Sequence, residues 1–240
     1  MQNLSQEVKK KLRGFAKKEK AEVLKRFFKT GKGEYGENDK FLGIVVPDIR
    51  KTVKYFSKQI STTDVLGFLH SEFHEERLFA LLVLVEKYKH GNDLEKKKIF
   101  EIYLKNIKKY INNWDLVDLT APNIVGDYLY SRDRAQLKQL AKSANLWEKR
   151  VAILSTFYFI YRNESKDTIV IAKMLLSDKH DLIHKAVGWM LREVGKRCSV
   201  DILEDFLKAN ANKMSRTALR YAIERLPEKR RIFWLKYQQN

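Results

Sequence analysis

The chain has 240 residues, of which 44% are hydrophobic, a fraction too high for a disordered protein, and its three prolines and ten glycines are too few for the turns of an all-β fold. Its 48 Lys and Arg against 30 Asp and Glu give a formal net charge of +18. That charge favours polyanions such as DNA, RNA or an anionic membrane surface, although a merely soluble basic protein is the plain alternative.

Residues 1–30 are predicted to form the N-terminal helices, and a glycine-rich loop follows at residues 30–40. The first helix has a narrow apolar stripe, more typical of docking on a protein than of lying on a membrane, at Leu4, Val8 and Leu12. The loop lacks the Gly-Lys-Ser/Thr spacing of a phosphate-binding loop. Either Lys32 and Tyr35 reach DNA from this loop, or the loop is a mobile connector.

The sequence predicts neither a membrane span nor an export signal. Its most apolar stretches, residues 78–85 and 151–160, are too short to cross a bilayer, and the N-terminus lacks the apolar region of a signal peptide. The single cysteine, Cys198, excludes an intrachain disulfide framework. We therefore expect a cytoplasmic protein, associated with the nucleoid when it is bound to DNA.

Residues 47–240 are predicted to form short antiparallel helices, because apolar residues recur there at helical rather than alternating spacing. Helix stop signals separate them at residues 90–93, 131–133, 162–165 and 226–227. The predicted N-cap residues are Asp93, Ser165 and Ser199.

These helices contain a repeat. A basic or polar residue precedes a buried helix with small residues at Arg77, Arg150, Lys185 and Thr217. The last three positions lie 35 and 32 residues apart, and the first two lie 73 apart, which predicts a further unit near residue 114. Stacked helical hairpins of this period form a curved solenoid. We therefore predict an all-α, HEAT-like helical-repeat solenoid that forms a single domain over residues 1–240.

We expect the repeated residues to stand first in their helices and to line a concave basic groove. Cations at a helix N-terminus oppose the helix dipole, so their recurrence needs a reason. Phosphate binding supplies that reason, because helix N-termini and cations both attract phosphate. Ordinary surface charge at helix starts is the alternative.

The chain resembles the bacterial AlkD-type DNA alkylation repair glycosylases over roughly residue 15 to the C-terminus. The resemblance rests on five segments in the same order: Lys40-Phe41-Leu42-Gly43-Ile44, Asn113-Trp114-Asp115-Leu116-Val117-Asp118, Trp147-Glu148-Lys149-Arg150-Val151-Ala152-Ile153, Lys185-Ala186-Val187-Gly188-Trp189-Met190-Leu191-Arg192-Glu193 and Ser215-Arg216. It implies the HEAT-like solenoid that the repeat also predicts. Either Phe27 or Phe28 falls where some members of this family carry a tyrosine.

The resemblance implies a role for each matching residue. Asp118 matches the catalytic carboxylate, and Trp114 and Trp189 match two aromatic residues that pack on the deoxyribose and backbone of the lesion. Arg150 matches the residue that holds the phosphate beside the lesion. Together with the repeat and the loop, the resemblance gives these expected DNA contacts: Arg150, Arg192, Arg216, Lys185 and Lys32.

The chemistry of an alkylated base explains these residue types. An N3- or N7-alkylated purine is cationic and leaves as a neutral base, so the enzyme must stabilise the oxocarbenium-like sugar and place a water. A carboxylate can do both, and aromatic faces can contact the cationic sugar. We expect a monofunctional glycosylase that hydrolyses the N-glycosidic bond in duplex DNA and acts as a monomer without a cofactor or metal. The resemblance implies that the lesion stays stacked, whereas most glycosylases flip the base into a pocket, and the sequence leaves both open.

Structural roles compete with each functional role. Trp114 and Trp189 could be core aromatics, and Arg150 could pair with Glu148 or Asp118. Asp118 lies four residues after Trp114 and therefore shares its helical face, and a carboxylate is unusual on a DNA-binding surface.

Other polar residues of the chain are predicted to have structural roles. Asp115 is expected to be a cap or first-turn residue. Two histidine pairs at i,i+4 lack the Glu of a His-Glu-x-x-His motif and are expected on solvated helix faces: His70 with His74, and His180 with His184.

Two other functions stay open. The chain could be a non-catalytic relative that binds branched or bent DNA, although such a protein has no need of a carboxylate beside its DNA. It could also be a HEAT-like scaffold for other proteins, in which case it would show little salt-dependent DNA binding.

Overall fold

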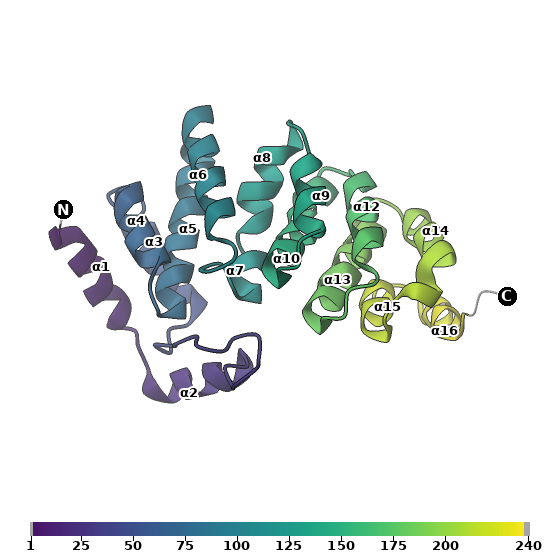
Figure 1. Cartoon of the computed structure of the whole chain (residues 1–240), viewed down its shortest axis with the longest axis horizontal. Coiled ribbons are helices and arrows are strands. Elements are labelled where there is room, and N and C mark those ends of the chain that lie inside the picture. Colours follow the sequence, from purple (N-terminus) through teal and green to yellow (C-terminus); the bar gives the residue numbers. More distant parts are fainter. Residues whose placement is uncertain (1, 238–240) are drawn as a thin grey trace. The chain divides into compact units, whose positions relative to one another are not determined.

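The computed structural model describes residues 2–237, with side chains from residue 4, and these residues are all-α, as predicted (Figure 1). They form two compact units, Met1–Thr120 (unit 1) and Ala121–Asn240 (unit 2). Paired helices in each unit are consistent with a HEAT-like helical-repeat protein. A single domain with one concave groove stays a prediction.

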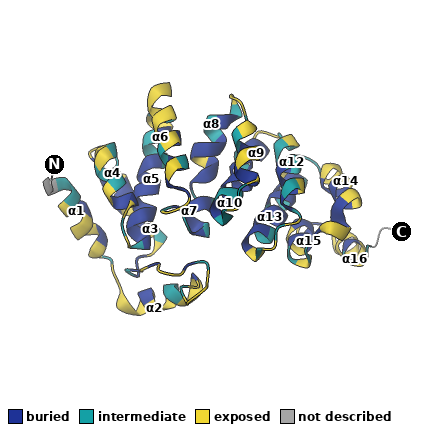
Figure 2. Ribbon diagram, in the orientation of Figure 1, coloured by how far each residue is buried: buried dark blue, intermediate teal, exposed yellow. Residues whose placement is uncertain are grey.

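Unit 1 is built around one central helix. Its elements are α1 (Gln2–Arg13), α2 (Lys18–Phe27), α3 (Val46–Phe56), α4 (Thr62–Leu69), α5 (His74–His90), α6 (Asp93–Asn106) and α7 (Trp114–Asp118). Helices α3, α4, α6 and α7 all pack against α5, and α1 packs against α3. Every residue from His74 to Leu84 is buried, so α5 is the core of this unit, as its dense apolar sequence predicted (Figure 2).

The segment between α2 and α3 has no regular helix but is held by polar contacts. Glu75 of α5 accepts hydrogen bonds from the backbone amides of residues 42–44. Gly43 has φ +82°, and an added Cβ would lie 2.0 Å from the carbonyl oxygen of Lys17, so a side chain there is strained and has no room. The Lys-Phe-Leu-Gly-Ile motif therefore marks a backbone crossing between α2 and α5.

Unit 2 is a series of packed helical pairs. Its elements are a π-helical turn η1 (Pro122–Gly126), α8 (Asp127–Tyr130), α9 (Ala135–Ala141), α10 (Leu146–Ser155), α11 (Phe157–Ile160), α12 (Lys166–Leu175), α13 (Asp181–Arg197), α14 (Val200–Asn210), a 3₁₀ turn η2 (Ala211–Lys213), α15 (Arg216–Ile223) and α16 (Glu228–Lys236). Helix α10 packs on α9 and α13, and α13 packs on α14 and α15.

Glycines let neighbouring helical segments of unit 2 approach closely. A Cβ on Gly126 would lie 2.3 Å from the carbonyl oxygen of Ser155, and a Cβ on Gly188 would lie 2.4 Å from that of Ala218. In both cases the next atom close to the added Cβ is the Cβ of a tyrosine, three residues after the residue whose carbonyl is contacted. The same contact therefore recurs after 62 residues, about two of the predicted periods, and it supports the predicted repeat within unit 2.

The predicted helix caps have three different outcomes. Ser199 accepts a hydrogen bond from the amide of Asp201 and caps α14, as predicted. Ser165 stands at the N-cap of α12 but makes no capping hydrogen bond. The prediction of Asp93 was wrong by one residue, because Asn92 caps α6 in a capping box with Glu95, which leaves Asp93 in the first turn.

Candidate active site

Helix α7 carries the two predicted catalytic residues of unit 1. Trp114 and Asp118, at its two ends, are half-buried, whereas the three residues between them are buried. The two side chains therefore reach the surface together from one face of a short helix, as their four-residue spacing predicted. Asn113 caps this helix, with its side-chain oxygen 2.8 Å from the amide of Trp114.

The ring of Trp114 rests on a stack of aromatic rings. It is stacked on Phe28 with ring centroids 5.2 Å apart, and Phe28 is stacked on Phe41 at 5.1 Å. His74 closes the stack, 4.7 Å from Phe41. Three rings thus support Trp114 from inside unit 1, with His74 in contact with both Phe28 and Phe41.

Phe27 is the exposed neighbour of this stack. Its side chain is 61% exposed, and its ring meets Trp114 edge-on at 5.9 Å. Phe28, by contrast, is buried within the stack. Phe27 or Phe28 falls where some members of the family that the chain resembles carry a tyrosine. Of the two, only Phe27 is exposed beside Trp114 and could therefore touch a ligand there.

A buried ionic network lies beneath α7. His74 has its Nδ1 atom 3.2 Å from Asp39 Oδ2 and its Nε2 atom 2.8 Å from Asp115 Oδ2. Asp39 also accepts from Arg77 at 2.6 Å and from Asn113 at 2.9 Å. The network ties the end of the glycine-rich loop to α5 and to the cap and first turn of α7.

The groups in this network stabilise each other's charged forms. Burial disfavours the cation of His74, but the Asp115 charge and hydrogen bonds to Asp115 and Asp39 raise the pKa of His74 to about 9. Burial likewise opposes ionisation of Asp39, yet its hydrogen bond with His74 and the charge of Arg77 lower the pKa of Asp39. Both residues are therefore charged at neutral pH.

The prediction for the histidine pairs was wrong. In the second pair, His180 is the N-cap of α13 and His184 lies inside this helix, and both are half-buried rather than solvated. His70 is the C-cap of α4 and His74 begins α5, so the two do not share a helix, and His74 is buried rather than solvated. The sequence spacing could not show this, because the partners of His74 lie 35 and 41 residues away along the chain.

Asp118 lies near the buried hydroxyl of Tyr103. Burial raises the pKa of Tyr103, and the nearby charge of Asp118 raises it further. The Tyr103 hydroxyl and the Thr120 hydroxyl are 2.9 Å apart, and Thr120 donates to the carbonyl of Leu116 in α7. The C-terminal end of α7 is thus anchored to α6 as its N-terminal end is anchored to α5.

In unit 2, Arg150 and Trp189 have different environments. Arg150 of α10 is 4% exposed, and its guanidinium donates to the carbonyl of Leu182 in the first turn of α13. Trp189 is half-buried on α13, with its ring 5.7 Å from that of Phe157. Trp189 therefore presents part of its ring to the surface.

The other predicted DNA contacts are nearer the surface. Lys185 pairs with Asp181 one helical turn away at 2.7 Å, and Arg192 pairs with Glu224. Arg216 is exposed and donates to the carbonyl of Leu235 at 3.0 Å. Lys32 is exposed on the glycine-rich loop of unit 1.

The repeated cations do not share one role, which corrects the sequence reading of a uniform row. Arg77 is 4% exposed and pairs with Asp39, so it is a structural residue of the core. Arg77, Arg150 and Lys185 also lie in the second turn of their helices rather than first. A basic residue at a repeated position therefore does not identify a phosphate contact by itself.

Sequence reasoning missed a group of arginines stacked on tyrosines in unit 2. The guanidinium of Arg162 lies 3.5 Å from the ring centroid of Tyr158 and 5.0 Å from that of Tyr130. Arg197 lies 4.2 Å from the centroid of the exposed Tyr161. A sequence signal existed, because Tyr158 precedes Arg162 by one helical turn.

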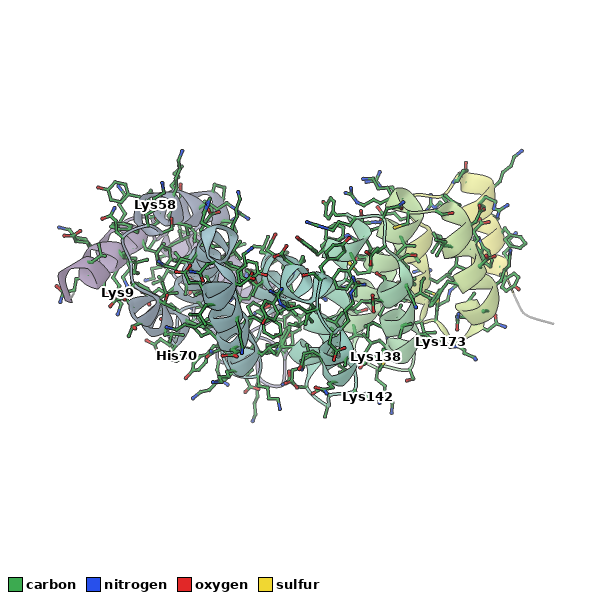
Figure 3. The ribbon with its side chains drawn as sticks, turned by 90° about the horizontal axis from the view of Figure 1, so that it is seen from above. Lys9, Lys58, His70, Lys138, Lys142 and Lys173 are labelled. Carbon is green, nitrogen blue, oxygen red and sulfur yellow. The ribbon has the colours of Figure 1, made fainter. Side chains whose placement is uncertain are left out.

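Exposed lysines add to the basic surface of both units, and Figure 3 labels Lys9 and Lys58 in unit 1 and Lys138, Lys142 and Lys173 in unit 2.

Among residues 2–237, no group of three or more His, Cys, Asp or Glu side chains is placed to hold a metal ion. No helix within the described part of the chain is long and apolar enough to cross a membrane.

Two of three comparisons with known proteins find a likeness. The sequence profile of a family described as DNA alkylation repair enzyme matches residues 8–226. Among solved structures, a protein from Enterococcus faecalis named as a predicted DNA alkylation repair enzyme has a TM-score of 0.68 and 16% sequence identity, covering 89% of this chain and 97% of its own. At that identity the likeness shows the fold. The comparison with curated protein sequences finds no match.

Proposed function

Because the chain belongs to the DNA alkylation repair enzyme family, we propose that it is a DNA glycosylase that hydrolyses the N-glycosidic bond of cationic N3- or N7-alkylated purines in duplex DNA. The observation that carries the proposal is the geometry of α7, which brings a carboxylate and a tryptophan to the surface of a chain with a net charge of +18. A carboxylate there disfavours DNA binding unless it acts on a developing positive charge.

Asp118 stabilises the sugar as the bond breaks. The alkylated base is already a good leaving group, so the positive charge passes to the deoxyribose, and a fixed carboxylate beside it lowers the barrier electrostatically. The same carboxylate can orient the attacking water. The position of the Asp118 carboxylate is preorganised, because both ends of α7 are tied to the core helices α5 and α6.

Trp114 packs on the deoxyribose of the lesion. Its ring is held by the stack of Phe28 and Phe41, so little side-chain freedom is lost when DNA binds. The ring face attracts the cationic sugar and excludes water, which strengthens the field of Asp118. Phe27, exposed beside it, adds an apolar contact without a hydroxyl.

Unit 2 supplies backbone contacts in this proposal. Trp189 offers a partly exposed ring, and Lys185, Arg192 and Arg216, which lie nearer the surface, bind phosphates. Arg150 is 4% exposed and bonded to Leu182, so it must turn away from α13 to reach the phosphate beside the lesion. Lys32 would contribute from the loop of unit 1. Affinity for duplex DNA is then expected to fall steeply with added salt, because each neutralised phosphate releases counterions. A protein scaffold would not show this dependence.

The test is the release of N7-methylguanine and N3-methyladenine from methylated duplex DNA by wild type and by Asp118→Asn. We expect the wild type to release base and the variant to be at least about 100-fold slower, the scale of losing one preorganised electrostatic contact. The matched control is Asp205→Asn, the same change at an exposed residue of α14, which should keep wild-type activity.

Other outcomes have distinct meanings. Unchanged activity in Asp118→Asn would remove Asp118 from the mechanism while keeping the glycosylase. Failure of both proteins to release base, with salt-dependent DNA binding retained, would overturn the enzyme proposal in favour of a non-catalytic protein that binds branched or bent DNA.

A further inference from the structure

We infer that His74 is a positioning residue for the candidate active site: it bridges Asp39 and Asp115 as a doubly donating imidazolium and so fixes α7, with Trp114 and Asp118, on the core helix α5. His74 itself touches no substrate, and its action passes through α7. The inference deepens the proposed function and rests on it.

The geometry requires both ring nitrogens of His74 to donate. Nδ1 faces a carboxylate oxygen of Asp39 at 3.2 Å, and Nε2 faces one of Asp115 at 2.8 Å. An ionised carboxylate only accepts hydrogen bonds, and a neutral imidazole donates from only one nitrogen. The neutral ring would therefore aim a lone pair at one of the two carboxylates, whereas the imidazolium satisfies both.

The bridge reaches α7 by two routes. Asp115 lies in its first turn and contacts His74 directly. Asp39 accepts from Asn113, the cap of α7, through the same Oδ2 atom that faces His74. Loss of the His74 contact would thus free the first turn of a helix that has only five residues and leave its cap tied through Asp39 and Arg77 alone.

The ring of His74 also supports Trp114 from below. It lies 4.7 Å from Phe41 and 4.9 Å from Phe28, and Phe28 carries Trp114. The position of the imidazole therefore sets the base of the aromatic stack. Trp114 depends on His74 through this stack as well as through the ionic bridge.

The charges around His74 balance only when it is protonated. Helix α5 contributes Arg77, the loop contributes Asp39, and α7 contributes Asp115. The next carboxylate on α5, that of Glu75, accepts hydrogen bonds from the backbone amides of residues 42–44 instead. Two carboxylates then face two cations, and loss of the His74 proton leaves one uncompensated negative charge in a buried site.

This balance predicts an alkaline limit to the ordered active site. The pKa of His74 is raised to about 9 against the effect of burial, so the bridge is complete at neutral pH and opens as pH rises past that value. Replacing Asp115 by asparagine removes one of the two charges that hold the proton. The bridge should then open at a lower pH.

The experiment follows the His74 imidazole by NMR titration in wild type and in Asp115→Asn, alongside the pH profile of base release. The resonance is assigned with His74→Gln. We expect a wild-type pKa near 9 and a decrease in Asp115→Asn of about one unit or more, the range for loss of one adjacent opposite charge. The pH at which base release falls on the alkaline side should decrease together with the pKa of His74, and the change should be mainly in kcat.

The matched control is His70→Gln, because the ring of His70 contacts the side-chain oxygen of Asn106 and no carboxylate. Its pH profile should equal that of wild type. A wild-type His74 that titrates at or below 7 would overturn the inference, and that measurement needs no variant to fold. An alkaline limb that stays in place while the His74 titration moves would also overturn it.

Failure of the glycosylase proposal would be distinguishable from failure of this inference. The titration and the emission of Trp114, taken as the signal lost in Trp114→Phe, are both measured on the free protein. Should no base be released by wild type, a Trp114 emission change that follows the His74 titration still supports the positioning role, and an emission that ignores the titration contradicts it.

Discussion

Each unit contains a histidine whose environment shifts its pKa, upward for His74 in unit 1 and downward for His180 in unit 2. In unit 1, two carboxylates hold His74 as a buried cation. In unit 2, burial chiefly lowers the pKa of His180, whose neutral Nδ1 accepts a hydrogen bond from the amide of Leu182 and caps α13. The same residue type is thus an ionic bridge where the chain is irregular and a helix cap where helices repeat.

The difference follows from what each unit has to hold. Unit 1 contains a long segment without regular helix, and its ends are fixed by side-chain contacts to α5 from residues such as Asp39 and Glu75. Unit 2 is a regular array, in which Gly126 and Gly188 let neighbouring helices pack closely. Buried ion pairs therefore fix the irregular segment of unit 1, whereas close helix contacts at glycines order the array of unit 2, which has ion pairs of its own at Glu193 and Glu204.

Breaking the ionic bridge should have the largest effect on stability. Asp39→Ala leaves Arg77 and His74 without a shared carboxylate, so we expect the free energy of unfolding of unit 1 to fall by about 3–5 kcal/mol. Urea unfolding followed by the emission of Trp114 would measure this. Asp48→Ala, which removes an exposed pair with Lys51, should cost less than about 1 kcal/mol, and equal losses would contradict an ionic core.

The pH dependence should separate the two units. The folded pKa of His74 lies above the unfolded value of 6.5, so its contribution is complete below pH 6.5 and is lost as pH rises to about 9, on the order of 3 kcal/mol in all. The folded pKa of His180 is lowered, so its contribution is complete above pH 6.5 and is lost as pH falls below that value.

Tryptophan emission can report the two pH effects separately. Trp114 lies in unit 1 and the other tryptophans, Trp147, Trp189 and Trp234, lie in unit 2. Urea unfolding between pH 5 and pH 9 should show the Trp114 transition weakening toward alkaline pH and the remaining transition, seen in Trp114→Phe, weakening toward acid. Parallel transitions at every pH would remove the contrast.

Close packing in unit 2 is tested at Gly188. An added Cβ would lie 2.4 Å from the Ala218 carbonyl oxygen, so Gly188→Ala should force α13 and α15 apart and cost about 1–3 kcal/mol of unfolding free energy. The control is Gly67→Ala in α4, where an added Cβ meets no atom within 4 Å. That change should stabilise by up to about 1 kcal/mol through helix propensity. A neutral Gly188→Ala would show that the helices can separate freely.

The smallest predicted effect concerns helix caps in unit 2. Ser199→Ala removes the hydrogen bond to the amide of Asp201 and should cost about 1 kcal/mol. Ser165→Ala changes a residue at an N-cap that makes no such bond, and it should be nearly neutral. Thermal unfolding of the two variants would measure both, and equal costs would argue against the capping role of Ser199.

Much of the site could be predicted where the relevant residues are close in sequence. Trp114 and Asp118 share a face because four residues make about one helical turn, and the structure places both at the surface of α7. The motif Lys40-Phe41-Leu42-Gly43-Ile44 is explained by a close backbone contact at Gly43, which only the fold reveals. Whether these residues bind and cleave alkylated DNA stays a prediction.

The sequence by itself determined the all-α class and the positions of many helix ends, because helical periodicity, caps and turn residues act over a few residues. Tertiary structure decided the roles of Arg77 and His74. The sequence predicted Arg77 on a groove and His74 on a solvated helix face, whereas the fold buries both. Their partner Asp39 accepts from Asn113, 74 residues further along the chain. Such contacts arise only when distant segments pack, so local spacing carries no record of them.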